Sequence, residues 1–166
     1  MRTFQECMLE YNQQMRIGAI PQAYQGLMAF LLSLRNRFKQ EHPELAAPGT
    51  FYQGVMDMSY FPLQSETLKG LGLKIAVVYL HEAGRFEAWL AAGNKQIQEH
   101  YWQLFTEQPQ QNYRLVPSIK GYDSILESVL VEMPDFSDLG ALGDQVISGT
   151  LAFARDVEVL LVERCA

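Results

Sequence analysis

The chain of 166 residues has few cysteines, fewer basic than acidic residues and no long apolar run. Its two cysteines, Cys7 and Cys165, lie near opposite ends. Their spacing allows a single disulfide between them. The simpler interpretation is two free thiols in a reducing compartment, one in the core and one at the tail. No stretch of about 18 apolar residues occurs, and the first residues lack a signal-like apolar segment. We therefore expect a cytoplasmic protein that makes no membrane contact.

Basic residues number 13 against 19 acidic ones, which gives a formal net charge of −6. Nucleic-acid binding without sequence preference needs a basic face that neutralises several phosphates, so we expect no nucleic-acid partner. The densest basic group is Arg35, Arg37 and Lys39 on an expected helix. Three cations spread around a helix are more typical of a solvated face than of a phosphate site.

Common catalytic motifs are absent as well. The sequence contains no P-loop, no Gly-x-Gly-x-x-Gly after a strand, no His-Glu-x-x-His, no Cys-x-x-Cys and no Gly-x-Ser-x-Gly. These absences disfavour the usual nucleotide-binding loops, zinc proteases, zinc fingers and α/β-hydrolases. His81 with Glu82 or Glu87 lacks a third ligand at a suitable spacing, so no metal site is predicted. The sequence identifies no cofactor.

Apolar residues make up 48% of the chain, which is enough to form one hydrophobic core. A chain of this length buries about 70% of the surface that it exposes when unfolded. No repeat, low-complexity tract or linker divides it. We expect a single domain over residues 1–166.

Two helices are predicted at the start. Thr3 and Glu6 have the spacing of a capping box, and an apolar stripe follows over residues 4–17 until Gly18. A second helix is expected from Pro21 to the His42-Pro43 stop. A connection of about three residues most simply makes the two helices an antiparallel hairpin.

In the central part of the chain, apolar and polar residues alternate in the pattern typical of β-strands. Residues 52–60 form one expected strand, ended by Pro62, and residues 74–81 and 86–90 form a β-hairpin. If the turn centres on residues 83 and 84, Leu80 faces Glu87 and Val78 faces Trp89. A slip of one residue would exchange the two faces of the hairpin.

A third helix is expected from the cap at Asn94 to about Glu107, followed by short strands over residues 113–116 and 124–133. Ser137 is the expected cap of a long last helix. This order predicts an α+β fold, with helices over one face of a mostly antiparallel sheet of four to five strands. It contains an N-terminal helical hairpin, one inserted helix and a long C-terminal helix.

Polar residues at and around the hairpin form a candidate cluster: Asp57, His81, Arg85, Glu87 and Lys95. Beside Trp89 on an apolar face, the pKa of Glu87 would rise unless Arg85, Lys95 or a backbone donor pairs with it. A raised pKa suits a general acid or base, but an ordinary buried ion pair is the more frequent arrangement.

Three aromatic residues on the expected strands are candidate pocket residues: Tyr60, Tyr79 and Trp89. The leading hypothesis is a non-catalytic domain that binds an unknown small molecule or protein, and the two-helix hairpin or the last helix offers surfaces for a homodimer. The alternative is a small metal-dependent hydrolase of the restriction-nuclease type, with Asp57 and Glu87 as its acids. The lysine of that pattern is replaced by Trp89, which counts against it. Convergence of Asp57, His81 and Glu87 in one pocket would favour the enzyme.

Several strings of the sequence together resemble an uncharacterised bacterial family known only as a domain of unknown function. They are Met56-Asp57-Met58-Ser59-Tyr60-Phe61, Leu73-Lys74-Ile75-Ala76-Val77-Val78-Tyr79, Phe86-Glu87-Ala88-Trp89-Leu90-Ala91, Asn94-Lys95-Gln96 and Pro134-Asp135-Phe136-Ser137-Asp138-Leu139. The resemblance covers nearly the whole chain. It implies a bacterial single-domain protein and assigns no catalytic residue.

Overall fold

The computed structural model describes residues 1–165, and in this part of the chain five helices accompany a five-stranded antiparallel sheet. The elements are α1 (Phe4–Ile17), α2 (Ala19–Glu41), β1 (Met58–Leu63), α3 (Glu66–Gly70), β2 (Leu73–Leu80), β3 (Arg85–Ala92), α4 (Lys95–Glu107), β4 (Arg114–Leu115), β5 (Leu126–Val131) and α5 (Leu139–Cys165). The strand order is β1-β2-β3-β5-β4. The predicted α+β class, with its inserted helix and long last helix, is confirmed.

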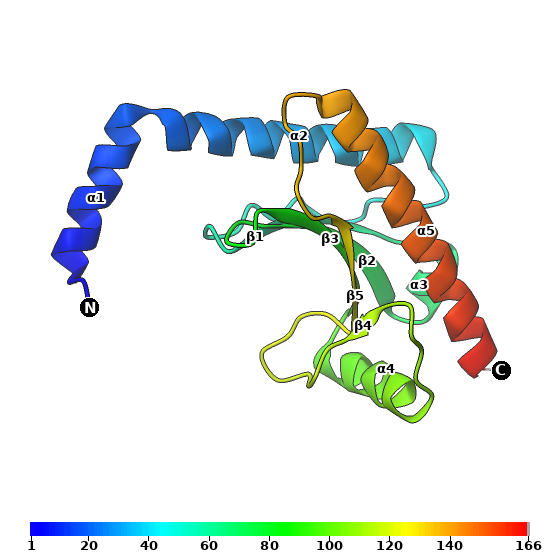
Figure 1. The fold of residues 1–166 in the computed structure, drawn as a ribbon. Helices are drawn as coiled ribbons and strands as arrows, with labels where there is room; N and C mark the ends of the chain where they lie inside the picture. Colours follow the sequence, from blue (N-terminus) through cyan, green and yellow to red (C-terminus); the bar gives the residue numbers. More distant parts are fainter. Residues whose placement is uncertain (166) are drawn as a thin grey trace.

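Alternation along the strands gives the sheet two different faces. One face carries large apolar side chains such as Ile75 and Leu90, which are fully buried in a core shared with Leu31, Phe38 and Phe153. Helices α2 and α5 supply the other side of that core and lie along the sheet in Figure 1. The opposite face of β1, β2 and β3, which we call the open face, is turned away from α2 and α5 (Figure 1).

The N-terminal helical pair is present, but its packing differs from the expected hairpin. Thr3 and Glu6 form the predicted capping box, and Gly18 ends α1 with a φ of 87°. The helices then meet at a bend of 73°, so α1 projects from the body instead of folding back along α2 (Figure 1). Within residues 1–165 no single helix has the length and apolarity to span a membrane, although α1 and α2 taken together pass that test.

The β2–β3 hairpin differs from the predicted one in register. The strands pair Val78 with Glu87 and Leu80 with Arg85, which is a shift of two residues from the expected pairing. A shift of two keeps every side chain on its predicted face, because side chains alternate with a period of two. The turn contains four residues, from His81 to Gly84, and Gly84 adopts a φ of 66°. His81 therefore lies in the turn, outside the β2–β3 pairing.

Strand β1 begins later and ends later than expected. Tyr52 makes only an isolated bridge to Tyr60, because the left-handed backbone of Gly54 (φ 79°) and Met56 (φ 66°) interrupts the extended run. Pro62 lies inside β1 and does not end it. A proline lacks the N–H that a central strand needs, and β1 at the edge of the sheet tolerates it.

The predicted N-terminal cap is confirmed for α4 but not for α5. The side chain of Asn94 accepts a hydrogen bond from the N–H of Ile97, as expected for the cap of α4. At α5 the cap is Asp138, whose Oδ1 accepts from the N–H of Ala141 at 3.0 Å. Ser137 instead donates its hydroxyl to Asp135. The prediction of Ser137 as the cap is therefore wrong by one residue.

Both cysteines are free and exposed. The expectation that one lies in the core is wrong, because Cys7 lies on α1, which contributes no buried residue. Figure 1 shows the two ends of the chain on opposite sides of the molecule. A bridge between Cys7 and Cys165 of one chain is therefore incompatible with this fold.

Candidate ligand-binding site

The structure divides the predicted polar cluster into three places. Arg85 and Glu87 lie together on the open face, where they are joined by a salt bridge. Asp57 and His81 lie at the hairpin end of the sheet, where the N–H of His81 donates to the carbonyl of Asp57. Lys95 opens α4 at the other end of the open face. The five residues therefore do not form one site.

Glu87 is the centre of a buried polar network. Glu87 is 3% exposed, and its Oε1 accepts a hydrogen bond from Arg85 Nε at 2.8 Å. The second oxygen, Oε2, accepts from the indole Nε1 of Trp89 at 2.6 Å. Arg85 also reaches Glu132 with its Nη1 at 3.0 Å. This is the ion-pair arrangement anticipated for Glu87, and it fixes the orientation of the Trp89 ring.

His81 lies on the other side of the sheet from Glu87. Its Nε2 is 2.9 Å from Ser59 Oγ, and its ring stacks on Tyr24 of α2. Burial lowers the pKa of His81, and the nearby carboxylate of Asp57 opposes this shift only in part. The histidine therefore lies among aromatic side chains and not beside the Glu87 network.

Asp57 is exposed, and its carboxylate is occupied by its own loop. Asp57 Oδ1 accepts from the N–H of Val55 at 3.0 Å. Backbone hydrogen bonds from Met58 and Val55 lower the pKa of Asp57. Asp57, His81 and Glu87 line no common pocket, and within residues 1–165 no group of three or more His, Cys, Asp or Glu residues is placed to hold a metal ion.

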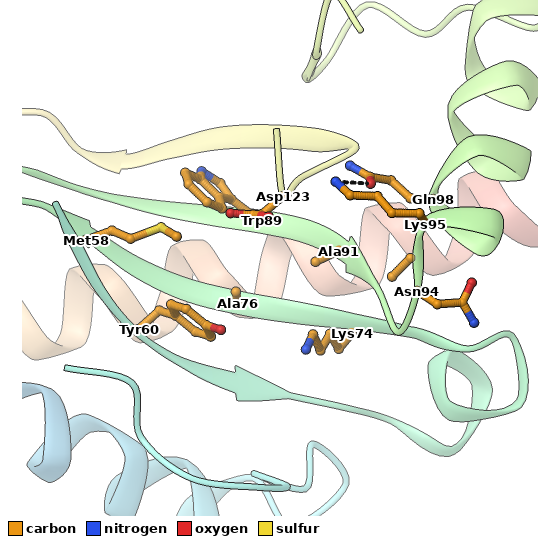
Figure 2. A pocket seen from close by; sticks show the side chains of 11 residues that line it. Met58, Tyr60, Lys74, Ala76, Trp89, Ala91, Asn94, Lys95, Gln98 and Asp123 are labelled. Atoms are coloured by element: carbon orange, nitrogen blue, oxygen red, sulfur yellow. Dashed lines mark hydrogen bonds between the residues drawn. The ribbon is translucent and has the colours of Figure 1, made fainter. Parts of the chain in front are cut away.

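A pocket of about 220 Å³ opens on the open face, between β1, β2 and β3 and the start of α4 (Figure 2). Its lining combines aromatic, small and charged side chains. The residues are Met58, Tyr60, Lys74, Ala76, Trp89, Ala91, Ala92, Asn94, Lys95, Gln98 and Asp123. We call it the sheet pocket.

Two aromatic rings flank a floor of small residues. Figure 2 shows Tyr60 of β1 and Trp89 of β3 on either side of Ala76 of β2. Burial raises the pKa of Tyr60, and the charge of Asp123 adds to this effect. Of the three candidate aromatics, Tyr60 and Trp89 thus meet in one pocket. Tyr79 lies on the opposite face of the sheet, where it contacts Phe86.

The charged groups lie at the rim of the sheet pocket. Lys74 and Lys95 line it beside a single acid, Asp123. Lys95 Nζ donates to Gln98 Oε1 and to the carbonyl of Tyr122, both at 3.0 Å. The site therefore carries one more positive than negative charge, although the chain as a whole is acidic.

Gln98 holds the loop that carries Asp123. Gln98 is 3% exposed, and its Nε2 donates to the carbonyls of Tyr122 and Ser124 at 2.9 and 3.0 Å. Asp123 lies between these two anchored residues, so the position of its backbone is fixed by α4. Sequence reasoning missed Gln98 and Asp123, because only the fold brings this loop to the sheet.

Lys74 was also missed, although the sequence contained a signal for it. It precedes Ala76 by two positions on β2, so the two side chains share a face. The same alternation places Trp89 and Ala91 on that face of β3. A search for charges on the strand positions that alternate with the core would have found Lys74.

Beyond Trp89 the open face continues into a second hollow of about 340 Å³, which shares Met58, Trp89 and Asp123 with the sheet pocket. Its charged side chains other than Asp123 are already paired. Arg114 Nη2 is 2.7 Å from Glu127 Oε2, and Ser124 Oγ donates to Glu127 Oε1 at 2.6 Å. The sheet pocket, where two lysines meet one aspartate, is therefore the better candidate for binding a charged ligand.

Comparison with protein families matches residues 4–161 to a domain of unknown function, DUF7000. No curated protein matches the chain, and no solved structure does. The match spans nearly every element of the fold, from α1 into α5. The chain therefore belongs to the DUF7000 family of domains of unknown function.

Proposed function

We propose that this protein is a non-catalytic binding domain whose sheet pocket takes a small, planar, anionic ligand with a single aromatic ring. The observation that carries the proposal is the fixed indole of Trp89, which faces Tyr60 across a floor of alanine. The aromatic walls favour a flat ring, the small volume of the pocket favours a single ring, and the positive charge at its rim favours an anionic group.

The aromatic walls are preorganised. The indole N–H of Trp89 is held by Glu87 at 2.6 Å, and Glu87 is held in turn by Arg85. An immobile ring loses little conformational freedom when a ligand stacks on it, which favours binding. Aromatic pairs in offset or edge-to-face contact add about 0.5–1.5 kcal/mol beyond the area that they bury.

The volume of the sheet pocket suits one ring. An apolar cavity of about 150 Å³ is large enough to hold benzene. The sheet pocket measures about 220 Å³, which leaves room for one ring and a carboxylate. The floor at Ala76 and Ala91 lets the flat face of a ring approach the strands.

The charges favour an acid with an additional hydrogen-bond donor. Lys74 and Lys95 are placed to attract a carboxylate at the α4 end of the pocket. Asp123 is an acceptor for an O–H or N–H on the same ligand. A hydroxybenzoate or aminobenzoate has both groups, whereas a neutral amide lacks the charge.

Fluorescence of Trp89 tests this proposal directly. The chain has two tryptophans, so Trp102→Phe leaves Trp89 as the single reporter. We expect saturable quenching by 4-hydroxybenzoate, with an affinity at least about tenfold above that for 4-hydroxybenzamide, which corresponds to about 1.4 kcal/mol. Lys74→Glu in the same background should abolish this preference for the acid.

Two results would contradict the proposal. The first is equal affinity for the acid and the amide, which would show that the lysines do not select charge. The second is an absence of saturable quenching across benzoate, hydroxybenzoates and aminobenzoates. Ala76→Leu is the matched control, because it fills the floor and should remove binding while leaving both lysines in place.

A bacterial cytoplasm is the setting that we propose for this binding. The free, exposed state of both cysteines supports a reducing compartment. The family resemblance of the sequence supports a bacterial source. We do not propose the metal-dependent hydrolase, because Asp57 and Glu87 are each engaged by other partners and line no common pocket.

A further inference from the structure

Helix α1 has an apolar stripe that its own chain covers only in part, at Met8 and Met15. Phe4, Met8, Tyr11 and Met15 follow one another at steps of four, three and four residues, which places them on one face of the helix. None of residues 4–17 is buried, and Phe4 and Tyr11 are 81% and 49% exposed. Figure 1 shows α1 standing clear of the sheet.

A helix of this length needs a partner. Isolated helices shorter than about 12–15 residues are marginal in water, and most helical stability in proteins comes from packing of an apolar face. The capping box at Thr3 and the left-handed Gly18 define the two ends of α1. They do not cover its stripe, so we expect a further packing contact for α1 from outside the chain.

The same chain carries an apolar groove of about 600 Å³ next to α1. It lies between the first half of α2, the hairpin end of the sheet and the segment before α5, and we call it the α2 groove. Its lining includes Ile20, Leu27, Met56, Phe136 and Leu139, and none of its lining residues is Asp, Glu, Lys or Arg. Four of these five side chains are at least 41% exposed: Ile20, Met56, Phe136 and Leu139.

We propose that two copies of this chain form a dimer in which α1 of each copy packs its stripe into the α2 groove of the other. Both unpartnered apolar surfaces then cover one another. A closed two-fold arrangement uses each stripe and each groove once, which leaves no copy with an unfilled surface. At about 1.5 Å per residue α1 is about 21 Å long, so it can extend into a neighbouring molecule.

Charge favours a second copy over a lipid surface as the occupant. Helices that lie on anionic membranes have polar faces rich in Lys and Arg. Over residues 2–17 the side chains of Arg2 and Arg16 balance those of Glu6 and Glu10, so α1 has no cationic face. The groove, in which His81 is the only lining residue that can carry a positive charge, matches the stripe, and the charged side of α1 remains in water.

Sedimentation equilibrium of the full chain tests the dimer. Tyr11→Glu places a charge in the stripe, whereas Gln13→Glu adds the same charge on the opposite side of the helix. Leu139→Glu places a charge in the groove at the first residue of α5, where an acid is favourable for the helix dipole. Both Tyr11 and Leu139 are about half exposed in the single chain, so neither change removes a core contact.

We expect the wild type and Gln13→Glu to sediment as dimers. Tyr11→Glu and Leu139→Glu should each weaken dimerisation at least tenfold. A wild type that stays monomeric at 100 µM would overturn the proposal, as would a dimer that survives both changes. Co-sedimentation of a monomeric wild type with phosphatidylglycerol vesicles, lost in Tyr11→Glu, would instead assign the stripe to a membrane.

Discussion

Glu87 connects the stability of the sheet to the shape of the pocket. A carboxylate that is 3% exposed is costly unless it is paired, and here both oxygens are occupied by Arg85 and Trp89. The residue that sequence reasoning selected as a possible acid or base is therefore a positioning group for an aromatic ring. Its neighbour Trp89, which departs from the nuclease pattern, is the side chain that we propose stacks on the ligand.

Glu87→Gln should lower the free energy of unfolding by about 1–3 kcal/mol, because a neutral amide is a weaker acceptor for Arg85 and Trp89 than the buried carboxylate. Urea denaturation measures the change. Glu132→Gln is the matched control, since Glu132 bonds to the same Arg85 but its side chain is 64% exposed. We expect that change to stay within about 0.5 kcal/mol. Equal effects of the two substitutions would show that burial of Glu87 does not govern its role.

His81 should make folding sensitive to mild acid. Burial lowers its pKa below the ordinary value of about 6.5, so near and below that pH the unfolded chain binds more protons than the folded one. Stability is therefore complete above about pH 6.5 and falls as the pH drops below it. NMR titration should place the pKa of His81 below 6.5, and His81→Phe should flatten the dependence. A pKa at or above 6.5 would contradict this account.

Secondary-structure elements were predicted well where the signal is local. The capping box and glycine stop of α1 and the Asn94 cap of α4 depend on residues within a few positions of one another. The faces of the β2–β3 hairpin followed from alternation, but its register depends on turn length, which the sequence allows in more than one form. The 73° bend between α1 and α2 depends on what surrounds them, so a short connection alone suggested the wrong packing.

The start of α5 provides a test at this scale. Asp138→Ala removes the side chain that accepts from the N–H of Ala141 and should lower the free energy of unfolding by about 1 kcal/mol. Ser137→Ala removes a hydroxyl that bonds only to Asp135 and should change it by less than about 0.5 kcal/mol. Thermal or urea unfolding of the two variants compares them. A larger loss of unfolding free energy in Ser137→Ala than in Asp138→Ala would contradict this account and support Ser137 as the cap.

At the scale of the whole molecule, the candidate site is assembled from segments that are far apart in the chain. Sequence reasoning found Tyr60, Trp89 and Lys95, which border expected strands and a helix cap. It did not predict that these residues share one pocket, because the strand order and the path of the loop at Asp123 are set by the tertiary structure. The α2 groove and the sheet pocket lie on opposite faces of the sheet, so binding and dimerisation can be tested separately.

The most direct test of the central claim is a two-dimensional ¹H–¹⁵N NMR titration of the protein with 4-hydroxybenzoate. We predict that the indole N–H of Trp89, the backbone N–H groups of Ala76 and Ala91 and the side-chain amide of Gln98 shift together and saturate. Lys74→Glu should weaken the affinity that these shifts report at least about tenfold. Saturable shifts confined to the α2 groove, or no saturable shift in the sheet pocket, would contradict the proposed ligand site.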